Sequence, residues 1–135
     1  MNNPATKKIL IVDDAITLIE MIQIRLEANG YQVFLAHDGQ EGITLAEKEL
    51  PDLILMDIMM PNMNGKEAVQ HLRSNPITNH IPIIFLTAAE TEEGQRNERQ
   101  VTINETIYPA IIKPFDSEKI LIRIKETFNP DPTSN

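Results

Sequence analysis

Short runs of apolar residues recur along this chain, and segments with a different periodicity separate them. An uninterrupted apolar run is typical of a strand that is buried on both faces of a sheet, because none of its positions alternates toward solvent. The chain is therefore predicted to contain five strands that need cover on both sides. These runs are Ile9–Val12, Val33–Ala36, Leu53–Met56, Ile83–Leu86 and Ala110–Ile112.

Most of the segments between these runs have apolar residues at helical spacing. Helices are predicted between Ala15 and Leu26, between Ile43 and Leu50, between Ala68 and Leu72, and between Ile120 and Phe128. Strands that alternate with helices predict parallel βαβ units. The expected fold class is α/β, a doubly wound five-stranded parallel sheet with helices on both faces.

The segment from Glu90 to Thr106 breaks this pattern, because Val101 and Ile103 are its only apolar residues. It is predicted to form a weak helix followed by a long loop, since a helix here would lack a buried stripe. Residues 1–128 are expected to form a single domain, and residues 129–135 a disordered tail.

Composition excludes several kinds of site. The 135 residues include no cysteine, which rules out a disulfide scaffold, a thiol nucleophile and cysteine-bound metals. The net charge of -8 argues against direct binding to nucleic acid. The apolar runs are too short for a signal peptide or a membrane span, so a soluble cytoplasmic protein is expected.

Polar residues follow four of the five predicted strands. Asp13 and Asp14 come after the first, Asp57 after the third, Thr87 after the fourth and Lys113 after the fifth. Ligands of open α/β sheets bind in the crevice beyond the carboxyl ends of the strands. These five side chains are therefore expected to converge at one edge of the sheet.

Three carboxylates that lie close together repel one another unless a cation sits among them. Ligand sets made only of oxygen suit a hard cation such as Mg²⁺, and a carboxylate can also act as a nucleophile and form an aspartyl phosphate. Each residue also has a simpler interpretation. Asp13 or Asp14 could cap a helix, Thr87 could end a strand, and Lys113 could be a solvated charge.

Four segments in this order resemble the receiver domain of two-component response regulators: KILIVDD, LILMDIMMPNMNG, PIIFLTA and IIKPF. The resemblance implies a flavodoxin-like sheet of strand order 2-1-3-4-5. It also implies that Mg²⁺ or Mn²⁺ binds to Asp13, Asp14, Asp57 and the backbone carbonyl of Met59. Asp57 matches the phosphoacceptor, and Thr87 and Lys113 match the residues that contact the phosphoryl group.

By the same resemblance, the phosphoryl donor is a sensor histidine kinase or a histidine phosphotransfer protein. The signal then passes to a downstream protein by a conformational change, without direct contact to nucleic acid or membrane. Such a protein modifies only itself, including its own dephosphorylation, and is not a conventional enzyme.

The sequence departs from the family at Ala110, where the family usually carries an aromatic switch residue. Tyr108 has the same strand parity and is expected to point to the same face. Reordering of Glu90 to Thr106 could replace the aromatic switch. Two alternatives stay open: a phosphorylation-independent pseudo-receiver that acts as an interaction module, and a small aspartyl-phosphate phosphatase. Met59 weighs against the phosphatase, because those hydrolases usually have a second Asp at that position.

Overall fold

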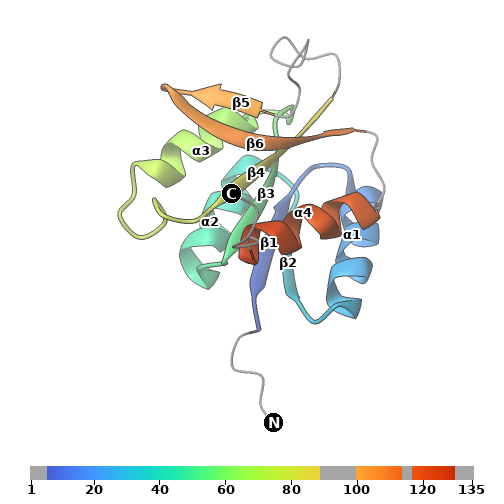
Figure 1. Ribbon diagram of the computed structural model, residues 1–135. Coiled ribbons are helices and arrows are strands. Elements are labelled where there is room, and N and C mark those ends of the chain that lie inside the picture. Colours follow the sequence, from blue (N-terminus) through green and yellow to red (C-terminus); the bar gives the residue numbers. More distant parts are fainter. Residues whose placement is uncertain (1–5, 89–99, 114–116, 130–135) are drawn as a thin grey trace.

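The computed structural model describes residues 6–88, 100–113 and 117–129, which form one sheet with helices on both faces (Figure 1). None of the helices in these ranges is both long and apolar enough to cross a bilayer. The elements are β1 (Lys8–Val12), α1 (Ile16–Ala28), β2 (Gln32–Ala36), α2 (Gly39–Glu49), β3 (Leu53–Asp57), α3 (Gly65–Arg73), β4 (Ile83–Ala88), β5 (Gln100–Ile103), β6 (Thr106–Lys113) and α4 (Ser117–Phe128).

The sheet has the strand order β2-β1-β3-β4-β6-β5. All neighbouring pairs are parallel except β5 and β6, which pair in the antiparallel sense. The predicted α/β class and the order of the five parallel strands are confirmed, with β6 as the predicted fifth strand. The predicted strand count is wrong, because β5 adds a sixth strand at the edge.

Two apolar layers hold the helices against the sheet, and strand alternation decides which residue enters which layer. In β1, Leu10 and Val12 face the layer that also contains apolar residues of α2 and α3. Ile9 and Ile11 face the opposite layer, which contains residues of α1 and α4. Burial on both faces explains why the parallel strands read as continuous apolar runs.

Gln100–Ile103 forms a strand, so the weak helix and long loop predicted for Glu90 to Thr106 are wrong over residues 100–106. The physical reason is a period of two: Val101 and Ile103 are buried, whereas Gln100 and Thr102 are exposed. Residues 90–99 of that prediction, and residues 130–135 of the predicted tail, lie outside the described residues.

The β5–β6 hairpin is fixed to the rest of the molecule by Tyr108. Its ring packs edge-on against Phe85, with 5.7 Å between the ring centroids. Arg73 Nε donates a hydrogen bond to Tyr108 Oη at 3.1 Å, and Arg73 Nη2 donates one to the carbonyl of Ile81 at 2.8 Å. Tyr108 and Ala110 are buried in the same layer, which confirms their predicted shared face.

Candidate functional site

Strand register brings the predicted site residues to one edge of the sheet. Asp57 is the last residue of β3 and pairs with Leu86 of β4, directly before Thr87. Lys113 ends β6 and pairs with Ala88 at the end of β4. Asp13 follows β1, and its backbone N–H donates to the carbonyl at the end of β2. The carboxyl ends of the parallel strands therefore meet here, as expected for this class of sheet.

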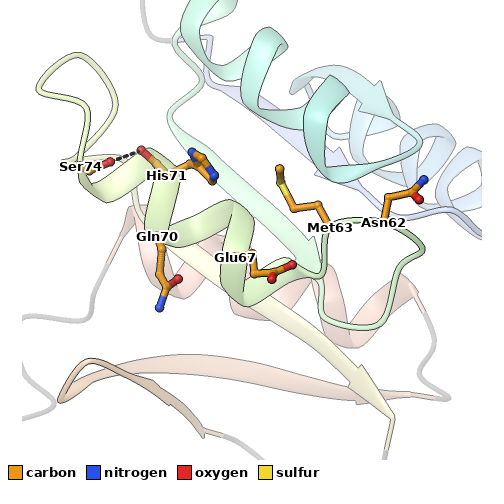
Figure 2. Close-up of a pocket in the computed structure, with 6 residues that line it drawn as sticks. All are labelled: Asn62, Met63, Glu67, Gln70, His71 and Ser74. Carbon is orange, nitrogen blue, oxygen red and sulfur yellow. Dashed lines mark hydrogen bonds between the residues drawn. The ribbon is translucent and has the colours of Figure 1, made fainter.

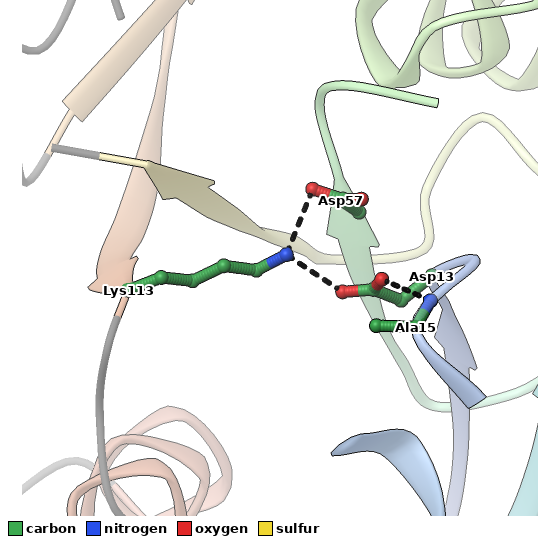
Figure 3. A network of polar contacts seen from close by, with 4 residues as sticks. All are labelled: Asp13, Ala15, Asp57 and Lys113. Atoms are coloured by element: carbon green, nitrogen blue, oxygen red, sulfur yellow. Dashed lines mark hydrogen bonds and ion pairs between the residues drawn. The ribbon is translucent and has the colours of Figure 1, made fainter. Parts of the chain in front are cut away.

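Lys113 joins two of the predicted carboxylates (Figure 3). Its Nζ lies 3.0 Å from Asp13 Oδ2 and 3.3 Å from Asp57 Oδ1. Asp13 is fully buried, Asp57 is only 4% exposed, and the Lys113 side chain is partly exposed. Burial weakens solvent screening, so the charges of this three-residue network interact more strongly with one another than those of a surface ion pair do.

The two carboxylate oxygens of Asp13 contact different groups. Oδ1 accepts a hydrogen bond from the backbone N–H of Ala15 at 2.9 Å, at the start of α1. Oδ2 is buried and accepts no hydrogen bond within the described residues, although it contacts the Lys113 ammonium. The simpler interpretation of Asp13 as a helix cap is wrong, because Ala15 is the N-cap residue of α1 and no side chain caps this helix. One oxygen of Asp13 instead binds the backbone of the turn before α1, and the other faces the charge cluster.

Asp14 completes a cluster that could hold a metal ion. Asp13, Asp14 and Asp57 each offer one carboxylate oxygen, and these oxygens lie within 4.8 Å of one another. Asp14 is exposed, so the cluster opens to solvent on its side. Three carboxylates and one ammonium leave an excess of negative charge, and the donor set consists only of oxygen, which suits a hard divalent cation.

The environment raises the pKa of Asp57 from 3.8 to about 6. Burial is the largest cause, the neighbouring Asp13 carboxylate adds to it, and Lys113 acts in the opposite direction. Burial alone would lower the pKa of Lys113, but the carboxylates of Asp57 and Asp13 raise it above its ordinary value. Lys113 therefore stays charged at neutral pH, whereas the ionisation of Asp57 depends on its surroundings.

Gly65 determines how closely α3 approaches the site. A Cβ at this position would lie 2.1 Å from the backbone oxygen of Asp57 and 3.0 Å from Ile58 Cα. The Gly65 N–H also donates to the carbonyl of Ile58 at 2.8 Å. Only glycine permits this approach of two backbone segments, so the turn after Asp57 needs the residue that the sequence has there.

Thr87 is buried near the end of β4. It directly follows Leu86, the residue of β4 that pairs with Asp57. Met59, in the loop that follows Asp57, is 66% exposed. Its predicted role, donation of the backbone carbonyl to a metal, stays a prediction.

The contact of Arg73 with Tyr108 could not be predicted from the sequence, because the two residues are 35 positions apart and no local pattern links them.

A pocket of about 510 Å³ lies elsewhere, along α3 and the loop before it (Figure 2). Met63 borders this pocket and also packs close to Gly39 of α2. The pocket includes none of the five residues at the strand ends, so it is separate from the candidate site. Its lining residues are Asn62, Met63, Glu67, Gln70, His71 and Ser74.

Comparison with known proteins bears on this site. The sequence profile of the response regulator receiver domain matches residues 9–125. Response regulator ArlR of Staphylococcus saprophyticus is 36% identical over 128 residues, which cover 95% of this chain and 55% of that protein. Protein PilH of Pseudomonas aeruginosa is 36% identical over 114 residues, which cover 84% of this chain and 91% of PilH. Several of the matched relatives are about twice as long as the aligned region.

Solved structures of proteins of this kind are also similar to this chain. Chemotaxis protein CheY4 of Vibrio cholerae aligns with a TM-score of 0.77 and 32% identity, over 90% of this chain and 98% of that chain. The receiver domain of sensor histidine kinase PA1611 from Pseudomonas aeruginosa aligns with a TM-score of 0.75 and 30% identity, over 90% and 97% of the two chains. That structure contains a magnesium ion coordinated in its active-site cleft.

Proposed function

Because this chain belongs to the family of response regulator receiver domains of two-component systems, we propose that it accepts a phosphoryl group on Asp57. The observation that carries the proposal is the network at the strand ends. A single ammonium lies 3.0 Å from Asp13 and 3.3 Å from Asp57. This arrangement gives a buried nucleophile, a cluster of acidic ligands and a cation in one place.

Asp57 is the nucleophile in this proposal. One of its carboxylate oxygens attacks the phosphorus of a phosphohistidine on a sensor histidine kinase or a histidine phosphotransfer protein. The new O–P bond forms as the N–P bond breaks, and the imidazole nitrogen leaves with the electron pair and takes up a proton. The carboxylate must be ionised to attack, and its pKa of about 6 permits this at neutral pH.

The donor set fits Mg²⁺ or Mn²⁺. The carboxylates of Asp13, Asp14 and Asp57 and the backbone carbonyl of Met59 would hold the ion. One oxygen of each of the three carboxylates lies within 4.8 Å of the others, which supports this assignment. When bound, the ion neutralises the carboxylates and the negative charge on the phosphoryl oxygens.

Lys113 and Thr87 stabilise the product. Once Asp57 carries the phosphoryl group as an acyl phosphate, its carboxylate charge is gone, and the Lys113 ammonium turns from Asp57 Oδ1 to a phosphoryl oxygen. The Thr87 hydroxyl donates to another phosphoryl oxygen. In this proposal the protein catalyses its own phosphorylation. It also catalyses its own dephosphorylation, in which water attacks the phosphorus, the O–P bond to Asp57 breaks, and inorganic phosphate leaves. The phosphorylated protein signals to a downstream protein partner by a change of conformation.

Intact-protein mass spectrometry tests this function. The protein is incubated with a small-molecule phosphoryl donor, with and without Mg²⁺, as wild type, Asp57→Asn and the matched control Asp52→Asn. Asp52 lies at the opposite end of β3, where its Oδ2 accepts the backbone N–H of Lys8 at 2.8 Å. We expect one phosphoryl group on the wild type and on Asp52→Asn, only with Mg²⁺. Absence of labelling, or labelling of Asp57→Asn, overturns the proposal.

A further inference from the structure

β6 is divided between two partner strands along its length. Residues 110–113 pair with β4, and residues 106–109 pair with β5. In the described part of the chain, neither half of β6 pairs with both neighbours. Figure 1 shows β5 alongside the first half of β6 only. The β5–β6 hairpin, residues 100–109, is therefore joined to the parallel strands through the continuous backbone of β6 and not through a shared ladder.

Pro109 lies at the point where the pairing changes. A two-residue turn joins the two strands of the hairpin, so Ile103 and Thr106 face each other as a hydrogen-bonded pair. Because backbone groups alternate along a strand, position 109 directs its backbone away from β5 and toward the β4 side of β6. Proline has no N–H to donate there. The pairing with β4 accordingly begins at Ala110.

Side chains hold the hairpin against the rest of the molecule. Val101, Ile103 and Tyr108 are buried in the layer that also contains apolar residues of α3. The Tyr108 ring also packs edge-on against Phe85 of β4. A two-stranded hairpin is at best marginally stable by itself in water. These side-chain contacts therefore decide whether the hairpin stays folded.

Arg73, the last residue of α3, provides the polar part of this attachment. Its Nη2 and Nη1 donate to the carbonyls of Ile81 and Thr78 at 2.8 and 3.4 Å, and both carbonyls lie outside the hairpin. These bonds orient the guanidinium, whose Nε donates to Tyr108 Oη at 3.1 Å. Its Cζ lies 5.4 Å from the centroid of the Tyr108 ring. Arg73 is thus held in place by the body of the domain and holds the hairpin through one residue.

We propose that the β5–β6 hairpin opens as one unit about the Pro109–Ala110 link while the rest of the sheet stays folded. The contact between Arg73 and Tyr108 is the latch that keeps the hairpin closed. Such an opening is a local unfolding event, because the detached hairpin cannot keep its own hydrogen bonds.

Opening changes one surface and spares another. It exposes Val101, Ile103 and Tyr108, so the latch controls access to an apolar face that the closed structure buries. Lys113 lies in the half of β6 that pairs with β4, so its contact with Asp57 is kept. This inference is therefore independent of phosphorylation at Asp57.

Native-state hydrogen exchange, followed by NMR, tests whether the hairpin is a separate unit. The amides of Val101, Ile103, Thr106 and Tyr108 bond within the hairpin, whereas β3 lies between two strands of the main sheet. We expect the four hairpin amides to share one opening equilibrium constant, at least about tenfold larger than that of β3. It should depend only weakly on low urea concentrations, because little surface is exposed. Equal opening constants and equal urea slopes for the two sets overturn the proposal.

Two variants separate the latch from general stability. Tyr108→Phe keeps the ring but removes the acceptor of Arg73 Nε, so it should increase opening of the hairpin about tenfold. It should speed exchange in β3 by the same factor, because the closed state loses stability relative to every open state. A change of less than about twofold at the hairpin would show that this contact is not the latch, and would overturn the proposal.

Ile22→Val is the control, because it weakens packing in the opposite layer. That layer stays intact when the hairpin opens. We expect Ile22→Val to speed exchange in β3 severalfold and to leave the four hairpin amides unchanged. If it accelerates both sets equally, the hairpin opens only when the whole domain unfolds, and the proposal fails.

Discussion

The ionised carboxylate of Asp57 destabilises the folded state relative to the unfolded state. Its pKa is 3.8 in the absence of the fold and about 6 within it, chiefly because the carboxylate is buried. Between these two values the folded state binds more protons than the unfolded state. The contribution of Asp57 to stability therefore falls as the pH rises through this window, and the penalty is complete above about pH 6.

Replacing Asp57 with Asn should consequently stabilise the protein without divalent cations. The shift from 3.8 to about 6, discounted for solvent screening, corresponds to about 1–2 kcal/mol in the free energy of unfolding at pH 7.5. The gain should vanish below about pH 3, where the wild-type carboxyl is protonated in both states. Urea unfolding at several pH values measures it, with Asp52→Asn as the control. An Asp57→Asn variant that is less stable at pH 7.5 would contradict this account.

Gly65 is constrained by space and not by its dihedral angles. The Gly65→Ala variant has to move the turn after β3, because its Cβ would lie 2.1 Å from the Asp57 carbonyl oxygen. We expect a loss of about 1–3 kcal/mol in the free energy of unfolding. Gly30→Ala is the comparison: its φ of 94° disfavours a side chain, but no atom lies within 4 Å.

The two glycine variants should differ most in function. Gly65→Ala displaces the backbone that carries Asp57, so it should slow Mg²⁺-dependent phosphorylation under conditions where the variant is still folded. Gly30→Ala should lose stability but label as the wild type does. Equal labelling of the two variants would show that the close approach of α3 does not position Asp57.

At the scale of elements, the parallel strands and the site could be predicted, but β5 could not. Burial on both faces makes a parallel strand a continuous apolar run, and this signal is strong even over four or five residues. β5 is buried on one face only, so its signal is the alternation of Val101 and Ile103 within a polar segment. Four alternating residues are weak evidence, and the turn that follows lacks the Asn-Gly pair that usually marks a hairpin.

The turn between β5 and β6 has two central residues with left-handed backbone, Asn104 and Glu105. Asn104 and Glu105 have φ values of 49° and 70°, as in a type I′ turn, where the second position favours glycine. Glu105→Gly should therefore raise the free energy of unfolding by about 0.5–1 kcal/mol, because relief of the left-handed backbone exceeds the entropic cost of glycine.

Glu105→Ala separates the backbone effect from the charge. Alanine removes the carboxylate but keeps a Cβ in the left-handed region, so it should give no comparable gain in urea unfolding. If alanine and glycine stabilise the protein equally, the removal of a negative charge from an acidic chain explains the gain, and the strain of the turn does not.

At the scale of the whole molecule, the site belongs to no single element. Asp13, Asp57, Thr87 and Lys113 lie at or next to the carboxyl ends of four different strands, and the parallel sheet brings these strand ends together. This is why the site could be predicted from four short segments of sequence before any contact was known. The charge balance could not be predicted, because it depends on burial and on which oxygen of Asp13 meets Lys113.

Because the acidic cluster joins several strands, a cation bound there should stabilise the entire domain. Mg²⁺ that binds the folded state alone raises the free energy of unfolding by about 1.4 kcal/mol at ten times its dissociation constant. The thermal midpoint of the wild type at pH 7.5 should rise with Mg²⁺ concentration, and it should rise less below about pH 6, where protonation of Asp57 competes with the ion.

The Asp57→Asn variant tests whether Asp57 belongs to the cation site. Without Mg²⁺ the variant should melt above the wild type, because the buried charge is gone, but added Mg²⁺ should raise its midpoint little, because a ligand is gone too. The difference between the two proteins should therefore shrink as Mg²⁺ is added. NaCl at matched ionic strength controls for screening, and Asp52→Asn controls for the loss of one carboxylate. Equal Mg²⁺ responses in Asp57→Asn and wild type would place the cation site away from Asp57.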